Sequence, residues 1–153
     1  MNKLPITIFA FWGIICTATA YDNEKAQFFN EFFTPFTGKE VAKQMQNITA
    51  EALLKRLELG EEFFFLDIRT EAETKIVRLG FENTLLVPMD KVFNEANLEK
   101  IPGDKNIVVV CAKGSRATAT AMALRQLGFK KTFILAGGIS GLTASLCPKK
   151  LNK

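Results

Sequence analysis

Histidine is absent from this chain of 153 residues, and tryptophan and tyrosine occur only once each. Without an imidazole, the chain cannot form a Ser-His-Asp triad, a Cys-His pair or the histidine-containing sites that hold most catalytic zinc ions. Any nucleophile must therefore be activated by other groups, and we expect neither a metal nor another cofactor. The remaining composition, 48% hydrophobic and 24% charged, is that of one globular domain.

The chain also lacks a strong charge of either sign, because its formal net charge is only +4. Basic residues are scattered along the sequence, apart from the last six residues, 148–153, which contain Lys149, Lys150 and Lys153. Such a distribution has no resemblance to the clustered basic patch of a nucleic-acid-binding protein. We therefore expect no nucleic-acid partner, and we treat residues 148–153 as a basic C-terminal tail.

The N-terminal segment has a single charge, at Lys3, followed by an uncharged run over residues 4–20. The apolar stretch over residues 6–15 has the length of a signal-peptide core, and Ala18-Thr19-Ala20 fits the small-x-small rule for cleavage. We therefore predict a signal peptide over residues 1–20 and an exported protein, with the periplasm as the expected compartment. No stable membrane insertion is expected after cleavage.

Two alternatives remain open for this segment. It could stay uncleaved as a membrane anchor, although it is short for a span and contains Pro5. Cys16 could instead carry a lipid, although Gly13-Ile14-Ile15 lacks the leucine and the small residue that a lipidation motif requires. Cleavage would leave Cys111 and Cys147, and two cysteines in an oxidising compartment also allow a disulfide.

Phenylalanines recur at near-helical spacing shortly after the predicted signal. They predict an amphipathic helix over residues 23–36, interrupted by Thr34-Pro35 and packed on the domain or docked to a partner. Residues 37–46 are polar and connect this helix to the rest of the chain. We assign residues 21–45 to a helical N-terminal extension and residues 46–147 to the main domain.

Strands and helices alternate along the main domain. The predicted strands are residues 47–48, 63–68, 84–88, 106–110 and 131–135. The predicted helices run from Thr49 to Gly60 and over residues 92–101, 116–127 and 139–146. In the first helix we expect Ala52, Leu53, Leu57 and Leu59 to face inward. In the third we expect Ala117, Ala121, Leu124 and Leu127 to face inward. This alternation predicts an α/β fold with a central, mainly parallel sheet and helices on both faces.

Cys111 follows the most strongly β-forming segment, at the carboxyl end where parallel sheets bind ligands. A thiolate is a nucleophile, and positive potential is needed to stabilise it. The first amides of the following helix supply that potential, and Gly114 allows the loop amides to converge into a cradle for an anion. Lys113 and Arg116 add cationic charge. The alternative is a buried structural cysteine beside a turn.

These residues resemble the motifs of the rhodanese family. Cys111-Ala112-Lys113-Gly114-Ser115-Arg116 is similar to the family's active loop. The strand end Asp67-Ile68-Arg69, followed by Glu71 and Glu73, is similar to its Asp-x-Arg motif. Leu135-Ala136-Gly137-Gly138-Ile139 is similar to its closing Gly-Gly turn. The resemblance covers residues 46–142, and it implies the rhodanese-like three-layer fold.

The resemblance also implies sulfur transfer through a covalent intermediate. Cys111 would take the outer sulfur of a small anionic donor such as thiosulfate, hold it as a persulfide and pass it to a thiophilic acceptor, either a thiol or a protein. The loop residues would bind the substrate, with Arg69 at the border of the pocket or in a structural ion pair with Asp67 or a nearby acid. These loop residues are Ala112, Lys113, Gly114, Ser115 and Arg116.

Spacing separates this loop from that of the phosphatases that share the fold. Cys111 and Arg116 are separated by four residues, whereas those phosphatases have five, because a phosphoryl group needs a wider ring of amides than a sulfur atom. One departure from the family concerns residues 75–83, which replace a Gly-His-Ile segment and contain no histidine. This departure bears on the choice of acceptor, and it leaves open an alternative function as a persulfide carrier or binding module without turnover.

Overall fold

The computed structural model describes residues 20–147. The predicted basic tail, the lipidation alternative at Cys16 and all of the predicted signal peptide except Ala20 lie outside the described residues. The chain divides into two units, with the boundary along the sequence between Pro35 and Phe36. In the first unit, α1 spans Asn23–Phe33, with the Asp22 side chain as its N-terminal cap. No α1 residue is buried, and its packing on the domain stays a prediction.

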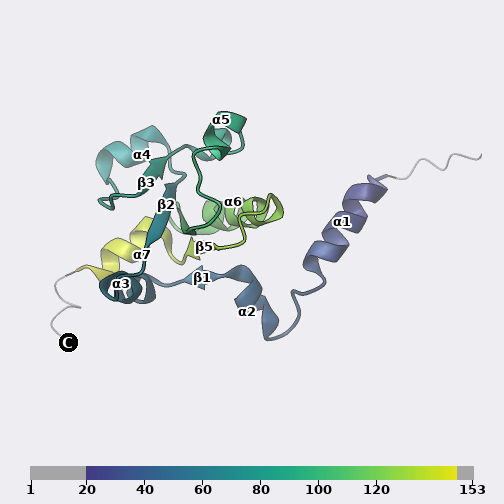
Figure 1. The fold of residues 1–153 in the computed structure, drawn as a ribbon, viewed down its shortest axis with the longest axis horizontal. Coiled ribbons are helices and arrows are strands. Elements are labelled where there is room, and N and C mark those ends of the chain that lie inside the picture. The colour runs from purple at the N-terminus through teal and green to yellow at the C-terminus, as the bar shows by residue number, and fades with distance from the viewer. Residues whose placement is uncertain (1–19, 148–153) are drawn as a thin grey trace, which may run out of the picture. The chain divides into compact units, whose positions relative to one another are not determined.

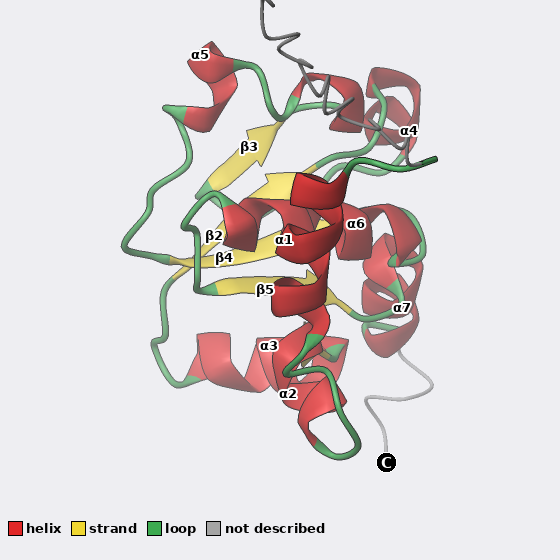
Figure 2. Cartoon of the chain, turned by 90° about the vertical axis from the view of Figure 1, so that its right-hand side faces the viewer, coloured by secondary structure: helices red, strands yellow, loops and turns green. Residues whose placement is uncertain are grey.

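The second unit contains five parallel strands in one sheet, in the order β1-β5-β4-β2-β3. Figure 1 shows β1 beside β5, and Figure 2 shows β5, β4, β2 and β3 in this order. The strands are β1 Asn47–Ile48, β2 Phe63–Asp67, β3 Thr84–Leu86, β4 Asn106–Val110 and β5 Thr132–Leu135. The sheet predicted from the sequence is therefore confirmed. The central strand β4 has four consecutive buried residues, as expected for a strand that is covered on both faces.

Helices cover both faces of this sheet. On one face, Ala117, Ala121 and Leu124 of α6 pack against alternate residues of β2 and β4. On the other face, α3 and α7 contribute Leu53 and Leu142 to the second half of the core. The helices of this unit are α2 Glu40–Met45, α3 Ala50–Glu58, α4 Glu71–Ile76, the 3₁₀ helix η1 Met89–Lys91, α5 Glu95–Leu98, α6 Ser115–Gln126 and α7 Gly138–Ser145.

Helix α2 belongs with the second unit, although the sequence places it in the N-terminal extension. Two hydrogen bonds join its end to the domain. The Arg125 guanidinium donates to the backbone carbonyl of Met45 at 3.2 Å, and the Gln46 side chain donates to that of Lys130 at 3.3 Å. These contacts tie the start of β1 to α6 and to the turn that precedes β5.

One predicted helix is wrong in its extent. Residues 92–101 form only the short α5 after η1, because the backbone of Asn94 is extended, with φ −69° and ψ 136°, and starts a new helix there. Three side chains predicted to face inward are exposed: Ala52, Leu59 at 76% and Leu127 at 56%. Leu59 and Leu127 follow the last residues of α3 and α6, so they are no longer held on the buried faces of those helices.

Helix α4 was not predicted from the sequence. Its signal was nevertheless present in the spacing Thr70-x-x-Glu73. These two residues form a capping box in which each side chain accepts a hydrogen bond from the backbone of the other residue.

Among the described residues, no helix is long and apolar enough to cross a membrane.

Candidate active site

Cys111 follows the last residue of β4, and its side chain is buried, with 1% of its surface exposed. The chain then turns through Ala112, Lys113 and Gly114 and enters α6 at Ser115. Gly114 has φ 110°, a conformation that residues with a Cβ rarely adopt. It also occupies the N-cap position of α6 and has no capping side chain. The first amides of α6 therefore remain free to face the loop.

Two backbone amides converge on the Cys111 sulfur. The amide of Gly114 donates to Sγ at 3.0 Å, and the amide of Ala117 donates at 3.4 Å. Both N–H groups lie at the N-terminus of α6, where the helix dipole adds to their positive potential. The arrangement stabilises negative charge on the sulfur without any side-chain base.

Further amides of the same loop have no acceptor among the residues that the structure describes. These amides belong to Ala112, Lys113, Ser115 and Arg116. Lys113 and Ser115 are exposed, whereas Ala112 and Arg116 are half-buried. The loop therefore combines two amides on Sγ with others that can serve a second anionic atom.

The start of α7 holds the active loop from behind. The amide of Ile139 donates to the Cys111 carbonyl at 2.8 Å, and that of Ser140 donates to the Ala112 carbonyl at 3.2 Å. Gly138 lies directly against this backbone, because a Cβ added there would come within 2.6 Å of the Ala112 carbonyl carbon. The Gly137-Gly138 turn expected from the sequence therefore fixes the carbonyl side of the loop, so that the amide side can face the sulfur.

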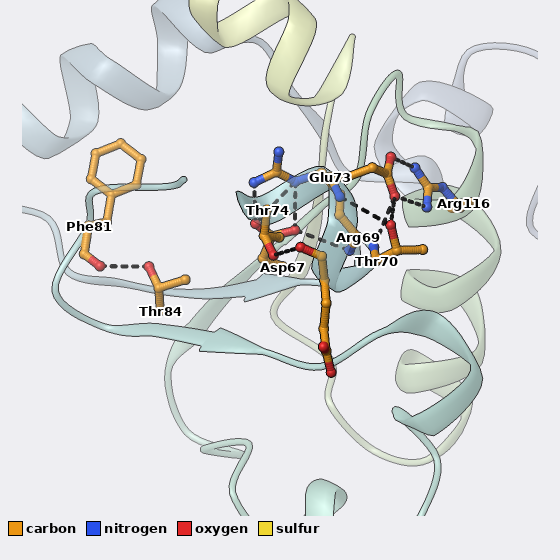
Figure 3. Close-up of polar contacts among 9 residues, drawn as sticks. Asp67, Arg69, Thr70, Glu73, Thr74, Phe81, Thr84 and Arg116 are labelled. Carbon is orange, nitrogen blue, oxygen red and sulfur yellow. Dashed lines mark hydrogen bonds and ion pairs between the residues drawn. The ribbon is translucent and has the colours of Figure 1, made fainter. Parts of the chain in front are cut away.

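Arg116 lies in the first turn of α6 and forms a two-pronged ion pair with Glu73 of α4 (Figure 3). Its Nη1 donates to one carboxylate oxygen at 2.9 Å, and its Nη2 donates to the other at 2.5 Å. The hydrogen bonds from Arg116 and then from the Thr70 amide lower the pKa of Glu73 to about 2. Glu73 in turn raises the pKa of Arg116, with smaller contributions from the charges of Cys111 and Asp67.

Glu73 is the functional candidate that sequence reasoning missed. In the sequence it stands out only as an acidic residue after the Asp-x-Arg strand end. The capping-box spacing Thr70-x-x-Glu73 gave the signal for a helix start, but its contact with Arg116 spans 43 residues and depends on the fold. The sequence offered no means of finding this pairing.

Arg69 lies in the ion pair that the sequence left open as an alternative. Its Nη2 is 2.6 Å from Asp67 Oδ2 and its Nε is 2.9 Å from Oδ1, and both side chains are buried (Figure 3). Its guanidinium is therefore committed to Asp67 at the end of β2. Lys113, by contrast, is exposed and has no ion-pair partner within residues 20–147.

The two cysteines of the second unit do not pair. Cys111 and Cys147 are both free thiols, one buried and one exposed, so they form no disulfide with each other. Within the described part of the chain, no three His, Cys, Asp or Glu side chains gather as metal ligands do. The disulfide that the sequence left open as an alternative is therefore not formed between Cys111 and Cys147.

A cavity of about 420 Å³ lies beside α4, and no residue of the Cys111 loop lines it. Its lining residues are Glu71, Thr74, Lys75, Arg78 and Leu86. Glu71, Thr74 and Lys75 follow the i, i+3, i+4 spacing of one helix face, and Glu73 lies on the opposite face. Helix α4 therefore separates this cavity from Arg116.

Comparison with known proteins identifies the family. The model of the rhodanese-like domain matches residues 49–145. A protein from Allochromatium vinosum named sulfurtransferase is 32% identical over 95 residues, which is 62% of this chain and 85% of that protein. The residues matched by the family model include Cys111 and all five loop residues from Ala112 to Arg116.

Two solved structures show the same fold. The rhodanese-like domain protein from Staphylococcus aureus superposes with a TM-score of 0.56 at 26% identity, and the match covers 63% of this chain and 90% of that one. A single-domain sulfurtransferase from Saccharomyces cerevisiae gives a TM-score of 0.50 at 25% identity, over 65% of this chain and 89% of that one. The chain, with its cysteine held by helix-start amides, therefore belongs to the rhodanese-like domain family and is similar to its sulfurtransferases.

Proposed function

We propose that this protein transfers sulfane sulfur from a small anionic donor such as thiosulfate to a thiophilic acceptor, through a persulfide on Cys111. The observation that carries the proposal is the pair of amides from Gly114 and Ala117 on the Cys111 sulfur. They place positive potential at the sulfur that would attack the donor. The unpaired amides beside them could then hold the negative charge of a second sulfur atom.

The reaction balances in two steps. The Cys111 thiolate attacks the outer sulfur of thiosulfate, a new S–S bond forms, and the bond within the donor breaks. Sulfite leaves with the electron pair of that bond. A nucleophilic acceptor such as cyanide or a thiolate then attacks the outer persulfide sulfur, and the Cys111 thiolate is released again. No oxidant, reductant or metal is needed in either step.

The charges near the loop favour an anionic donor. Lys113 is exposed and unpaired within the described residues, whereas the charge of Arg116 is offset by Glu73. The amides and Lys113 therefore attract an incoming anion together with the Arg116 guanidinium, which Glu73 holds in place. The four-residue spacing from Cys111 to Arg116 supports a ligand the size of sulfur rather than a phosphoryl group.

A second candidate function is a carrier that passes one sulfur to a partner protein without repeated turnover. The observation that favours it is the exposed apolar segment at the end of α4, where Ile76 is 84% exposed and Val77 is 40% exposed. These residues belong to the stretch that departs from the family pattern. Exposed neighbouring apolar side chains suit a protein contact.

A steady-state assay tests the leading proposal and separates the two candidates. The purified chain is given thiosulfate and cyanide, and thiocyanate is followed over time. We expect many equivalents per chain, none from Cys111→Ser and the full rate from Cys147→Ser. Release of one equivalent and no more would support the carrier instead. Equal activity of Cys111→Ser and the wild type would contradict both candidates.

We also propose that the protein is exported, with the signal over residues 1–20 removed. The proposal is supported by the apolar run and by the Ala18-Thr19-Ala20 pattern. N-terminal sequencing of the protein after secretion by a Gram-negative host tests it. A new N-terminus at Tyr21 in the periplasmic fraction is expected, whereas an intact Met1 in the membrane fraction would favour the anchor.

A further inference from the structure

We propose that Glu73 is a positioning residue for sulfur transfer, which holds the Arg116 guanidinium in place at the border of the Cys111 loop. This inference rests on the proposed function, and it adds a residue that the motifs of the active loop do not contain. Glu73 would act through Arg116 and touch neither the donor nor the reacting sulfur.

The contacts of the Glu73 carboxylate are divided between two elements. One oxygen accepts from Arg116 Nη2, and the other accepts from Arg116 Nη1, from the Thr70 amide and from the Thr70 hydroxyl, each at 2.9 Å (Figure 3). Two parallel hydrogen bonds between a guanidinium and a carboxylate fix the plane as well as the distance of the pair. Arg116 therefore cannot rotate freely while both bonds are present.

Glu73 is itself held in place by the carboxyl end of the sheet, where Cys111 also lies. Thr70 follows β2 by three residues, and the amide of Ile68 donates to the carbonyl of Val110, the residue before Cys111, at 2.9 Å. The capping box then fixes Glu73 relative to Thr70. The chain of contacts from Val110 through Ile68 and Thr70 to Glu73 gives the carboxylate a defined place near the active loop.

Arg116 is the member of the loop whose freedom this contact restricts. Its side chain is one-third exposed, at 32%, so solvent alone would leave it mobile. Its backbone amide belongs to the set without an acceptor in the described residues. While Glu73 holds the guanidinium in one place, its charge acts from that place on an anionic donor that enters the loop.

Two physical roles of Glu73 make opposite predictions for donor affinity. If its negative charge only weakened the positive potential of the loop, its removal would strengthen the binding of an anionic donor. If it positions Arg116, its removal should weaken that binding, because the guanidinium would sample many orientations. We expect the second result, an increase of at least threefold in KM for thiosulfate, with kcat changed less.

The test compares Glu73→Gln with Glu71→Gln in the full chain. The two variants remove the same charge from the first turn of the same helix, but Glu71 has no contact with Arg116. Glu71→Gln should keep the wild-type KM. Glu73→Asp keeps the charge but shortens the side chain, so it cannot reach Thr70 and Arg116 together, and its KM should also rise. A wild-type KM in Glu73→Asp would overturn the proposal.

A double-mutant cycle separates positioning from a purely structural role of the helix cap. In an Arg116→Ala background, Glu73→Gln should cause no further increase in KM. A full additional effect there would overturn the proposal, because Glu73 would then act without Arg116. A KM in Glu73→Gln equal to or below that of the wild type would overturn it as well.

Failure of this inference can be distinguished from failure of the proposed function. The mass of each variant after incubation with saturating thiosulfate shows whether Cys111 has gained a sulfur atom. If the wild type gains none, the sulfur-transfer function itself fails. If the wild type and Glu73→Gln both gain one at the same donor concentrations and rates, only the positioning role fails.

Discussion

The backbone amide of Gly114 lies 3.0 Å from the sulfur of Cys111 and donates a hydrogen bond to it. The residue that turns the chain into α6 therefore also solvates the nucleophile. Glycine suits this position because its φ is 110°. In a chain without histidine, such backbone contacts take the place of a side-chain base.

The close packing of Gly138 against the active loop predicts a large loss of stability even when alanine replaces it. Gly138→Ala should lower the free energy of unfolding by about 2–4 kcal/mol, because the new Cβ would overlap the backbone of Cys111 and Ala112 and because φ is 57°. Urea unfolding measures the loss. Gly128→Ala is the matched control, since Gly128 also has positive φ (105°) but no atom within 4 Å of an added Cβ. Equal losses in both variants would show that contact with the loop is unimportant.

The Glu73–Arg116 ion pair predicts a defined pH dependence of stability. The pKa of Glu73 is lowered from 4.5 to about 2, so folding favours its ionised form. The stability that it contributes is fully present above pH 4.5 and is lost as the pH falls toward 2. Unfolding of wild type and Glu73→Gln from pH 7 to pH 2 measures this difference, which should shrink only in the acidic range. A difference that persists unchanged at pH 2 would contradict the assignment.

The buried pair of Asp67 and Arg69 predicts an asymmetry between single and double substitutions. Asp67→Asn should destabilise the protein by about 3–5 kcal/mol, because it leaves a buried guanidinium without its counter-charge. The double variant Asp67→Leu, Arg69→Met should recover most of this loss. Chemical denaturation of the three proteins gives the comparison. A double variant as unstable as Asp67→Asn would indicate that the charges are needed for more than mutual neutralisation.

The buried contacts of Arg125 predict that its substitution lowers the stability of the fold and leaves sulfur transfer unchanged. It is 6% exposed, burial lowers its pKa, and its Nη1 donates to the carbonyls of Met45 and Thr132. Arg125→Met should cost about 1–3 kcal/mol of unfolding free energy, since two carbonyls lose a donor. The exposed Arg78→Met should cost less than about 0.5 kcal/mol. An unaltered denaturation midpoint in Arg125→Met would contradict its role in anchoring β1 and β5.

The elements with a strong local signal could be predicted from the sequence. Strand β4 is β-branched from Ile107 to Val110, and α3 begins at the threonine cap that the sequence indicates. The helix expected over residues 92–101 was wrong because apolar spacing does not reveal that Asn94 adopts an extended conformation. Leu59 and Leu127 are exposed because each helix ends one residue before them, and helix propensity does not predict a helix end to within one residue.

The candidate site also has one part that could be predicted from the sequence and one part that could not. The loop from Cys111 to Arg116 is contiguous, so its composition and spacing are enough to propose a cradle of amides. The ion pair from Arg116 to Glu73 joins residues 43 positions apart, and the commitment of Arg69 to Asp67 is decided by burial. The first pairing could not be found in the sequence, because it depends on how α4 and α6 meet at the carboxyl end of the sheet. The second was one of two alternatives that the sequence left open, because the sequence does not show which side chains are buried together.

Cys111 is the residue proposed to carry sulfur, and one measurement tests this directly. The protein is incubated with thiosulfate, freed of excess donor and weighed intact, and the modified residue is located by peptide mapping. We predict the added mass of one sulfur atom, on Cys111 and not on Cys147, and no addition in Cys111→Ser. An unchanged mass with every sulfane-sulfur donor tried, or a sulfur atom that remains in Cys111→Ser, would contradict the account.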